Sequence, residues 1–378
     1  MNRKQLQRLF PVSRTHAFMN HAGVSPLPGP VRDAMLDYIR CSARARWPHD
    51  NELDEARRLF AQMVGSLFEE VAFTPNTSLA LNIAAGKLLQ QRSGNILVNE
   101  LEYPSNIYPW LKLAERGFEM RWVKPENGTL PLENFERLVD DETRAIAISH
   151  VQWGNGFRCN LKALAEIAHR HNAMLVVDAI QSAGALPLNV KRDDVDFLCC
   201  ASYKWLLGPP GVGFLYVNKQ HLKDWNPSLV GWCSVKGGED SYADLYYTYD
   251  KKRLQFHDDA RKFELGTPST VSIVGVRESL RLLLRQGLRN VERKILKVSD
   301  YLIDQLRSLR LEVLTPLEPR YRSGIVTFKV KNPEEVAAKL RRAKVWVTAR
   351  MGGVRVSPHF YNREEDIDRL VRAVKSLR

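Results

Sequence analysis

Short apolar, β-branched runs recur between residues 70 and 217 and are separated by stretches with helical periodicity. The runs are EVAFT (70–74), NILVN (95–99), RAIAISH (144–150), AMLVVDA (173–179), VDFLCCAS (195–202) and VGFLYV (212–217). Helical spacing of apolar residues lies between them at 77–91, 106–116, 131–139 and 161–171. Because strands joined by helices of this length form right-handed crossovers, the pattern predicts an α/β fold with a mainly parallel, buried sheet.

The pattern changes from about residue 271 onward. A long helical stretch is followed by SGIVTFKV, and the remaining elements are a helix at 333–343, short strands near 345–349 and 353–357, and a final helix at 364–377. A chain of 378 residues is long enough for two units. We therefore expect a large α/β domain over 18–270, a smaller C-terminal α+β domain over 271–378, and an N-terminal arm of residues 1–17 packing with the small domain.

The composition is that of a globular protein, with 44% hydrophobic and 26% charged residues. No apolar run approaches the roughly 20 residues that span a bilayer, and the N-terminus lacks the features of a secretory signal. We therefore expect no membrane association and a cytoplasmic location. The net charge of +13 is spread along the chain without a nucleic-acid-binding motif, so no nucleic-acid partner is expected.

The five cysteines form no CxxC pair and no grouping with histidine. The sequence therefore predicts neither a metal site nor a disulfide framework. Cys199 and Cys200 end an apolar run and are expected to be buried strand residues.

Ligands of open α/β sheets bind beyond the carboxyl ends of the strands, so residues that follow the apolar runs are candidates for the site. Asp178 ends one run, where an unpaired buried carboxylate would be costly. Lys204 follows another run, 26 residues later, before the turn GPPGVG. The two residues are expected either to form a buried ion pair or to flank a pyridine ring, with the carboxylate at the ring nitrogen and the lysine as an imine.

The segment FTPNTS places Asn76, Thr77 and Ser78 at a strand-to-helix junction. Backbone N–H groups at a helix N-terminus, together with short hydroxyls, suit a phosphate group, although an ordinary helix cap is the commoner role for such residues. The turn GPPGVG matches neither the Walker pattern nor the dinucleotide fingerprint. It is interpreted as a tight connection that presents Lys204.

An ordered set of motifs runs along the chain: FMNHAGVSPLP, FTPNTS, NELEYPSNIYPW, ISHVQWGNG, VVDAIQSAG, ASYKWLLGPPGVGFLYV, KFELGTPS and VRVSPHFYN. Taken together, these segments resemble the class V aminotransferase and cysteine desulfurase superfamily of enzymes that use pyridoxal phosphate (PLP). The resemblance covers nearly the whole chain. It implies the fold type I architecture of PLP-dependent transferases, PLP as cofactor, an amino acid as substrate, and a homodimer with active sites shared between subunits.

The resemblance also implies roles for individual residues. Lys204 resembles the imine lysine, which later acts as acid and base at the substrate Cα, and Asp178 resembles the partner of the pyridinium nitrogen. Gln181 resembles the hydrogen-bond partner of the cofactor's phenolic oxygen, and Tyr103 occupies the position of the aromatic ring stacked on the pyridine. Residues that resemble phosphate contacts are Asn76, Thr77, Tyr203 and, supplied by the neighbouring subunit, Thr267.

On the substrate side, Arg355 resembles the arginine that binds the α-carboxylate, a role suited to its bidentate fork. Asn20, His21 and Trp232 occupy segments that line or border the substrate pocket in the family. Simpler interpretations stay open. Tyr103 could be an interfacial aromatic, Arg355 could pair with Asp366 or Glu365, Asn20 and His21 could form a turn that caps the next helix, and Trp232 could be a buried structural residue.

Two departures from the superfamily pattern bear on the reaction. Cysteine desulfurases carry a catalytic cysteine on the loop before the carboxylate arginine, whereas AKVWVTARMGGVRVSP contains none. A persulfide-forming desulfurase is therefore not expected unless Cys233 or another thiol reaches the site. Near Trp153, where desulfurases place an asparagine beside the phenolic oxygen, Gln152 is the candidate substitute.

The expected function is chemistry at Cα of an amino acid, either transamination or a β-elimination similar to that of C–S lyases. An epimerase similar to isopenicillin N epimerase, or a hydrolase similar to kynureninase, is the alternative within the superfamily. A non-catalytic basic scaffold that retains the fold is the alternative from another class. Loss of Lys204 or Asp178 would favour the scaffold, and both are present.

Overall fold

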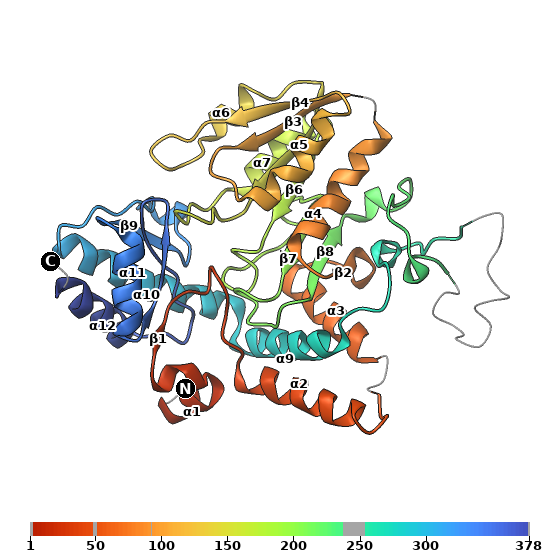
Figure 1. Cartoon of the computed structure of the whole chain (residues 1–378). Coiled ribbons are helices and arrows are strands. Elements are labelled where there is room, and N and C mark those ends of the chain that lie inside the picture. The colour runs from red at the N-terminus through yellow and green to blue at the C-terminus, as the bar shows by residue number, and fades with distance from the viewer. Residues whose placement is uncertain (1–2, 48–50, 92, 237–253, 377–378) are drawn as a thin grey trace.

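A seven-stranded sheet forms the centre of the computed structural model, which describes residues 3–47, 51–91, 93–236 and 254–376 (Figure 1). Its order is β2-β8-β7-β6-β5-β3-β4. The strands are β2 (Val71–Thr74), β3 (Gly94–Asn99), β4 (Phe118–Val123), β5 (Thr143–Ser149), β6 (Met174–Asp178), β7 (Phe197–Ala201) and β8 (Gly213–Val217). Only β8 runs antiparallel to its neighbours, β2 and β7. The other pairs are parallel, which confirms a mainly parallel sheet.

All six apolar runs are strands of this sheet, and β4 is the one strand of the sheet that they do not include. The strand β4 pairs only with β3, and its central residues are partly exposed. An edge strand with one wet face has mixed polarity, so FEMRWV lacks the continuous apolar character that marks a doubly covered strand. The predicted burial of Cys199 and Cys200 in β7 is confirmed.

Helices cover both faces of the central sheet (Figure 1). On β7, Phe197 and Cys199 belong to one apolar cluster, while Leu198 and Cys200 belong to another. This alternation places consecutive side chains on opposite faces, which explains why the whole run is apolar. The first cluster includes residues of α4 (Thr77–Gly86) and α5 (Tyr108–Ala114).

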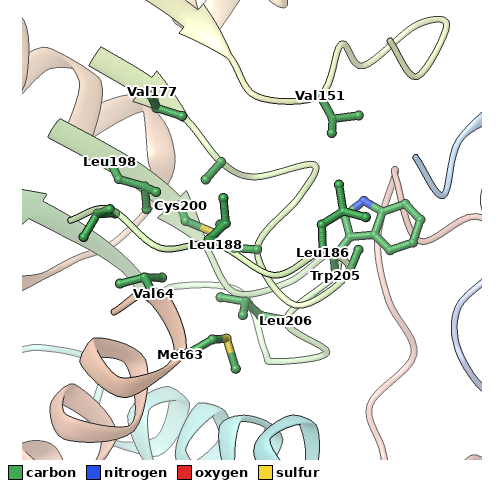
Figure 2. Packing of buried hydrophobic residues seen from close by; sticks show 14 of the residues in the cluster. Met63, Val64, Val151, Val177, Leu186, Leu188, Leu198, Cys200, Trp205 and Leu206 are labelled. Carbon is green, nitrogen blue, oxygen red and sulfur yellow. The ribbon is translucent and has the colours of Figure 1, made fainter. Parts of the chain in front are cut away.

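The second cluster includes residues of α3 (Asn51–Val64), α7 (Leu161–His169) and α9 (Thr270–Gln286). Figure 2 shows Met63 and Val64 of α3 packing toward Leu198, Cys200 and Leu206. Trp205 belongs to the same cluster, so the segment that carries Lys204 is anchored in the core. The sequence patterns do not single out α2 (Gly29–Ser42), which packs on α9 and buries only Gly29 and Val31.

The C-terminal part is a separate α+β layer (Figure 1). Its antiparallel sheet has the order β11-β12-β9, and its own apolar cluster lies between this sheet and the helices. The elements are α10 (Leu288–Ser308), β9 (Val326–Lys329), α11 (Pro333–Arg342), β10 (Val345–Trp346), β11 (Thr348–Arg350), β12 (Gly353–Val356) and α12 (Glu364–Lys375). The final helix ends at Lys375, whereas the sequence predicts a helix to residue 377, which lies outside the described residues.

The N-terminal segment joins this layer through β1 (Ala17–Phe18), which pairs in parallel with β10. The N-terminal segment also includes α1 (Arg3–Leu9). In the large part of the chain, the short helix α6 (Leu132–Glu136) lies between β4 and β5 in the sequence. Short 3₁₀ turns are Pro11–Arg14, Phe68–Glu70, Lys87–Gln90, Pro104–Asn106, Lys219–His221, Trp232–Ser234, Ala260–Phe263 and Pro319–Tyr321. Of the helices that the structure describes, none is long and apolar enough to cross a bilayer.

The long helical stretch after residue 271 is two helices rather than one. Gly287 has φ +75° and separates α9 from α10. Glycine adopts this left-handed conformation without a Cβ penalty, so the chain can turn there. The helix α9 packs against α2 and α3, whereas α10 packs against β9 and α12. The proposed division of the chain at residue 271 stays a prediction.

Candidate active site

The carboxyl ends of β2, β3, β6 and β7 meet at one edge of the sheet, where a cavity of about 170 Å³ lies. Eight of the residues expected from the sequence line it: Asn76, Thr77, Tyr103, Asp178, Gln181, Tyr203, Lys204 and Arg355. Ala22, Gly23, Ser78, Ser105, Trp153, Ile180 and Arg350 complete the lining. Residues that are up to 333 positions apart in the sequence therefore line the same cavity.

Lys204 lies three residues after β7, in a turn closed by the bond from Leu207 N–H to the Lys204 carbonyl (3.0 Å). Its Nζ is 5.8 Å from the ring centroid of Tyr103 and 5.8 Å from that of Tyr203. Burial lowers the pKa of the Lys204 amine, the Asp178 carboxylate opposes this, and Arg355 adds to it. A lowered pKa increases the fraction of free amine near neutral pH, which is the nucleophilic form.

Asp178 is the last residue of β6 and is buried. Its Oδ1 accepts a hydrogen bond from Ile180 N–H (2.9 Å). Burial raises the pKa of the Asp178 carboxyl, the Ile180 N–H lowers it, and the nearby Glu102 raises it further. Among the described residues, neither Asp178 nor Lys204 forms an ion pair. The buried ion pair that the sequence left open is therefore not formed, and both side chains face the cavity.

The N-terminus of α4 borders the same cavity. Asn76 is its N-cap, and its Oδ1 accepts from Leu79 N–H (2.9 Å), as the capping interpretation predicts. The Thr77 hydroxyl accepts from Ala201 N–H (2.9 Å), which ties the helix to the end of β7. The Ser78 hydroxyl donates to that of Ser105 (3.0 Å). The first N–H groups of an α-helix have no partner within the helix, so this end can also bind an anion.

Tyr103, Trp153 and Arg355 contact one another in the lining. The Tyr103 ring is 45% exposed and meets the Trp153 ring edge-on, with centroids 5.4 Å apart at 76°. The buried Arg355 donates from Nη1 to the Trp153 carbonyl (2.7 Å). Burial, reinforced by the Arg350 guanidinium, lowers the pKa of Arg355 to about 10.

The alternative pairing of Arg355 with the last helix is wrong. Asp366 instead accepts from Asn362 Nδ2 (3.0 Å) and from Arg363 N–H (3.2 Å), because it stabilises the first turn of α12. Among the described residues, Arg355 has no carboxylate partner, and its Nε is buried without a hydrogen bond.

Gln181 lines the cavity, but its amide is already engaged. Its Nε2 donates to the Ala22 carbonyl (3.1 Å), and its Oε1 accepts from Trp205 Nε1 (2.9 Å). The second Nε2 hydrogen remains available as a donor. The contact with a phenolic oxygen therefore stays a prediction.

The remaining expected residues lie outside this cavity. Gln152 is buried and donates to Glu102 Oε1 (3.1 Å), and Asn20 accepts from the Thr348 hydroxyl (2.8 Å). His21 is buried between the Ser357 carbonyl (3.0 Å) and the Tyr361 hydroxyl (3.0 Å). The neighbouring Ala22 and Gly23 line the cavity in their place.

Two further residues lie near each other at another surface. Thr267 lines a separate cavity of about 350 Å³. Trp232 is 37% exposed, and its indole lies 3.4 Å from the position that a Cβ on Gly266 would occupy. The roles of Gln152, Asn20, His21, Thr267 and Trp232 stay predictions. These five positions do not contact the cavity within one subunit.

Two charged residues at or near the site were assigned no role from the sequence. Arg350 lines the cavity, although it falls between the strands expected near 345–349 and 353–357. Glu102 lies beneath the cavity, where its carboxylate accepts from Ser149 N–H (2.6 Å), the Ser149 hydroxyl (2.5 Å) and Asn99 Nδ2 (2.8 Å). The position of Glu102 between an aromatic residue and the strand end was the available signal, but a surface glutamate has the same appearance in a sequence.

Fold and cavity together define a class of protein, the α/β enzymes of PLP fold type I. The chain belongs to the class V aminotransferase family, which matches residues 17–370. It is 30% identical over 368 residues to the uncharacterized aminotransferase YcbU of Bacillus subtilis strain 168, covering 96% of this chain and 95% of that protein. Enzymes of this family use PLP.

Solved structures agree with this fold. A cysteine desulfurase of Thermococcus onnurineus NA1, in its apo form, superposes with a TM-score of 0.89 at 26% identity, covering 100% of this chain and 98% of that chain. A C-DES variant with glycine covalently linked to its PLP cofactor has a TM-score of 0.87 at 23% identity, covering 97% and 98%. The likeness to the Thermococcus onnurineus enzyme, together with the family match, also places this chain among enzymes similar to cysteine desulfurases.

Proposed function

We propose that this chain binds PLP through Lys204 and catalyses transamination or β-elimination at Cα of an amino acid. One observation supports this most directly. A half-buried amine and a buried carboxylate face one cavity without forming an ion pair. Two opposite charges that are buried for stability alone would be expected to contact each other, because each otherwise keeps an uncompensated cost of desolvation.

The donor set fits the cofactor. The Lys204 amine would hold the aldehyde carbon covalently, and its lowered pKa favours the free amine that this requires. Asp178 would accept a hydrogen bond from the ring nitrogen. Burial raises its pKa, and a protonated ring nitrogen in contact would oppose that shift. Tyr103 would lie against the face of the ring, as its position in the family motif implies.

At the other end of the cofactor, the N-terminus of α4 and the hydroxyls of Thr77 and Tyr203 would bind the phosphate. The bound cofactor would supply an electron sink for the negative charge that develops at Cα. Arg355 would bind the α-carboxylate of the substrate with the guanidinium hydrogens that the Trp153 carbonyl leaves free. Lys204 Nζ would remove and return the proton at Cα.

A persulfide route has less support. Of the described residues that line the cavity, none is a cysteine. Cys233 is buried in the 3₁₀ turn Trp232–Ser234, outside the lining, and burial raises the pKa of Cys159, Cys199 and Cys200 above that of an ordinary thiol. A desulfurase of this kind needs an accessible thiolate. Transamination and β-elimination need none.

The covalent attachment can be tested by mapping. The purified chain is incubated with PLP, reduced with borohydride and digested, and the modified peptide is identified by mass spectrometry. We expect the adduct on Lys204. Lys262 is a matched internal control, because desolvation lowers its pKa as it does that of Lys204, but its Nζ donates to the Leu222 carbonyl (2.6 Å) away from the cavity. Modification of Lys262 in preference to Lys204, or of neither, would contradict the proposal.

The type of reaction is tested separately by product analysis. Transamination consumes a keto-acid acceptor in equal amount to the amino acid, whereas β-elimination releases ammonia with pyruvate and a leaving group such as sulfide. Amino acids are therefore screened with independent assays for keto acid, ammonia and sulfide. Lys204→Ala should lower turnover by at least about 10²-fold, because it removes both the anchor and the acid/base. Turnover that survives this substitution would refute the assigned role.

A further inference from the structure

Two arginines from one hairpin face the candidate active site. Arg350 ends β11, Arg355 lies in β12, and both line the cavity. In the antiparallel register Thr348 lies opposite Arg355. Side chains two residues apart on a strand point to the same face, so Arg350 shares the face of Thr348 and is the diagonal neighbour of Arg355. Diagonal neighbours are within reach of long side chains. The hairpin therefore presents two guanidinium groups together.

Packing holds this hairpin against the cavity wall. Beyond Arg350, Met351 and Gly352 form the turn. A Cβ on Gly154 would lie 1.8 Å from the sulfur of the exposed Met351 side chain, so the glycine lets Met351 pack closely against this segment. Gly154 follows Trp153, whose carbonyl accepts from Arg355. Arg355 thus contacts the segment 153–154 directly, and Met351, which follows Arg350, packs on the same segment.

The two guanidinium groups lack a negative partner. Arg350 is exposed, and its Nη1 donates to the Ala349 carbonyl (2.8 Å). Arg355 donates to the Trp153 carbonyl and has a buried Nε without a hydrogen bond. Within the described part of the chain, no carboxylate forms an ion pair with either residue. Each arginine instead raises the electrostatic cost of the other, since Arg350 lowers the pKa of Arg355.

Of the charged side chains that line the cavity, one has no anion assigned to it by the proposed function, in which the N-terminus of α4 and nearby hydroxyls bind the cofactor phosphate. Among the described lining residues the basic groups are Lys204, Arg350 and Arg355, and the one carboxylate is Asp178. The proposed function assigns Lys204 and Asp178 to the cofactor and Arg355 to the α-carboxylate. Arg350 has no assigned anion. An α-amino acid with a neutral side chain offers none.

We propose that Arg350 determines specificity for an amino acid whose side chain carries a second anionic group, such as a carboxylate, and that Arg350 binds this group. The proposal rests on the proposed function. Since Arg350 is exposed, its contact with a carboxylate is partly screened by water. A bidentate geometry in the mouth of a cavity still favours the anion over its neutral isostere by roughly tenfold, which corresponds to about 1.4 kcal/mol.

The test uses the PLP-loaded enzyme and measures amino acid binding by the change in cofactor absorbance. Aspartate is compared with asparagine, and glutamate with glutamine, because each pair differs mainly in charge. The wild-type protein should bind at least one acid about tenfold more tightly than its amide. In Arg350→Gln this preference should disappear while the affinity for the amides is unchanged. Arg350→Glu should prefer the amides.

Arg342→Gln is the matched control. Arg342 ends α11 on the same small layer, is exposed, and lies outside the cavity, so the substitution removes the same charge. It should leave the preference intact. Lower affinity for acids and amides alike in Arg350→Gln would show that Arg350 serves the α-carboxylate, and lower PLP affinity would assign it to the cofactor. Either outcome overturns the proposal, as does a wild-type protein without acid preference.

Failure of the proposed function has a different signature. If Lys204 does not bind PLP, no amino acid of any charge will change the cofactor absorbance, and the mapped adduct on Lys204 will be missing. A protein that forms the adduct and responds to neutral amino acids best would retain the proposed function and lose only the specificity.

Discussion

The turn that carries Lys204 depends on a glycine in the neighbouring loop. Gly184 has φ +91°, and a Cβ built on it would lie 2.3 Å from the Trp205 carbonyl oxygen and 3.0 Å from the Leu206 Cα. The obstructing atoms are backbone and cannot rotate away. The same oxygen accepts a hydrogen bond from His359 Nε2 (3.0 Å), and the Trp205 indole is buried and donates to Gln181 (2.9 Å).

The free-energy cost of Gly184→Ala has two parts. Alanine in the left-handed region costs about 1–2 kcal/mol. Relieving the contact requires a shift of about 1 Å to reach an ordinary carbon–oxygen separation of about 3.4 Å, and overpacking of this kind costs about 1–3 kcal/mol. We therefore expect a loss of about 2–5 kcal/mol in the free energy of unfolding. Since Trp205 adjoins Lys204, the same shift should lower turnover by up to about 10²-fold.

Urea unfolding of the cofactor-free protein, monitored by tryptophan fluorescence, measures the first effect. Gly287→Ala is the matched control, because Gly287 also has positive φ (+75°), but no atom of the described residues lies within 4 Å of the position that a Cβ there would occupy. It should lose only the conformational part, about 1–3 kcal/mol for alanine in a sparsely populated φ/ψ region. Equal stability and equal turnover of the two variants would refute the argument that backbone contact at Trp205 positions Lys204.

Two other predictions concern pH and assembly. Burial alone would raise the pKa of Asp196, but hydrogen bonds from His169 and His221 outweigh it and hold this pKa at about 2, below its usual 3.8. The stabilisation is therefore complete above pH 3.8 and is lost as the pH falls toward 2. In urea unfolding, Asp196→Asn should destabilise the protein by about 2 kcal/mol near neutral pH and by roughly half of that near pH 3. We also propose a homodimer in which Thr267 serves the site of the neighbouring subunit. Mixing the inactive Lys204→Ala variant with the impaired Thr267→Ala variant should then restore activity, because each heterodimer has one intact site. No gain of activity on mixing would contradict this arrangement.

The elements that the sequence predicts best are those buried on both faces. The run that forms β7 is apolar at every position because both faces pack against helices, and its end therefore locates Lys204 within a few residues. In contrast, the interruption at Gly287 depends on the conformation of one residue. A lone glycine in a helical pattern is tolerated in many helices, so the pattern alone could not decide whether the chain turns there.

The site divides in the same way. Asp178 and Lys204 are expected at the cavity because strand ends share an edge. Resemblance of a motif carries over the residue type but not the side chain's environment. His21 matches a family segment, yet it is buried beside His359 and Tyr361, where its pKa is lowered by burial and then by His359. In this segment the cavity is lined by the small residues Ala22 and Gly23 instead of His21.

The orientation of Arg350 could not be predicted from the residue pattern. Strands expected near 345–349 and 353–357 leave residue 350 in the turn, with no face assigned to it. In the structure β11 extends to Arg350, and the register with β12 decides which face its side chain takes. A shift of one residue would invert the strand and point Arg350 away from Arg355. The charge of the cavity therefore depends on the length of the turn at Met351 and Gly352. Inserting one residue there should abolish the proposed acid preference while leaving the proposed Lys204 adduct intact.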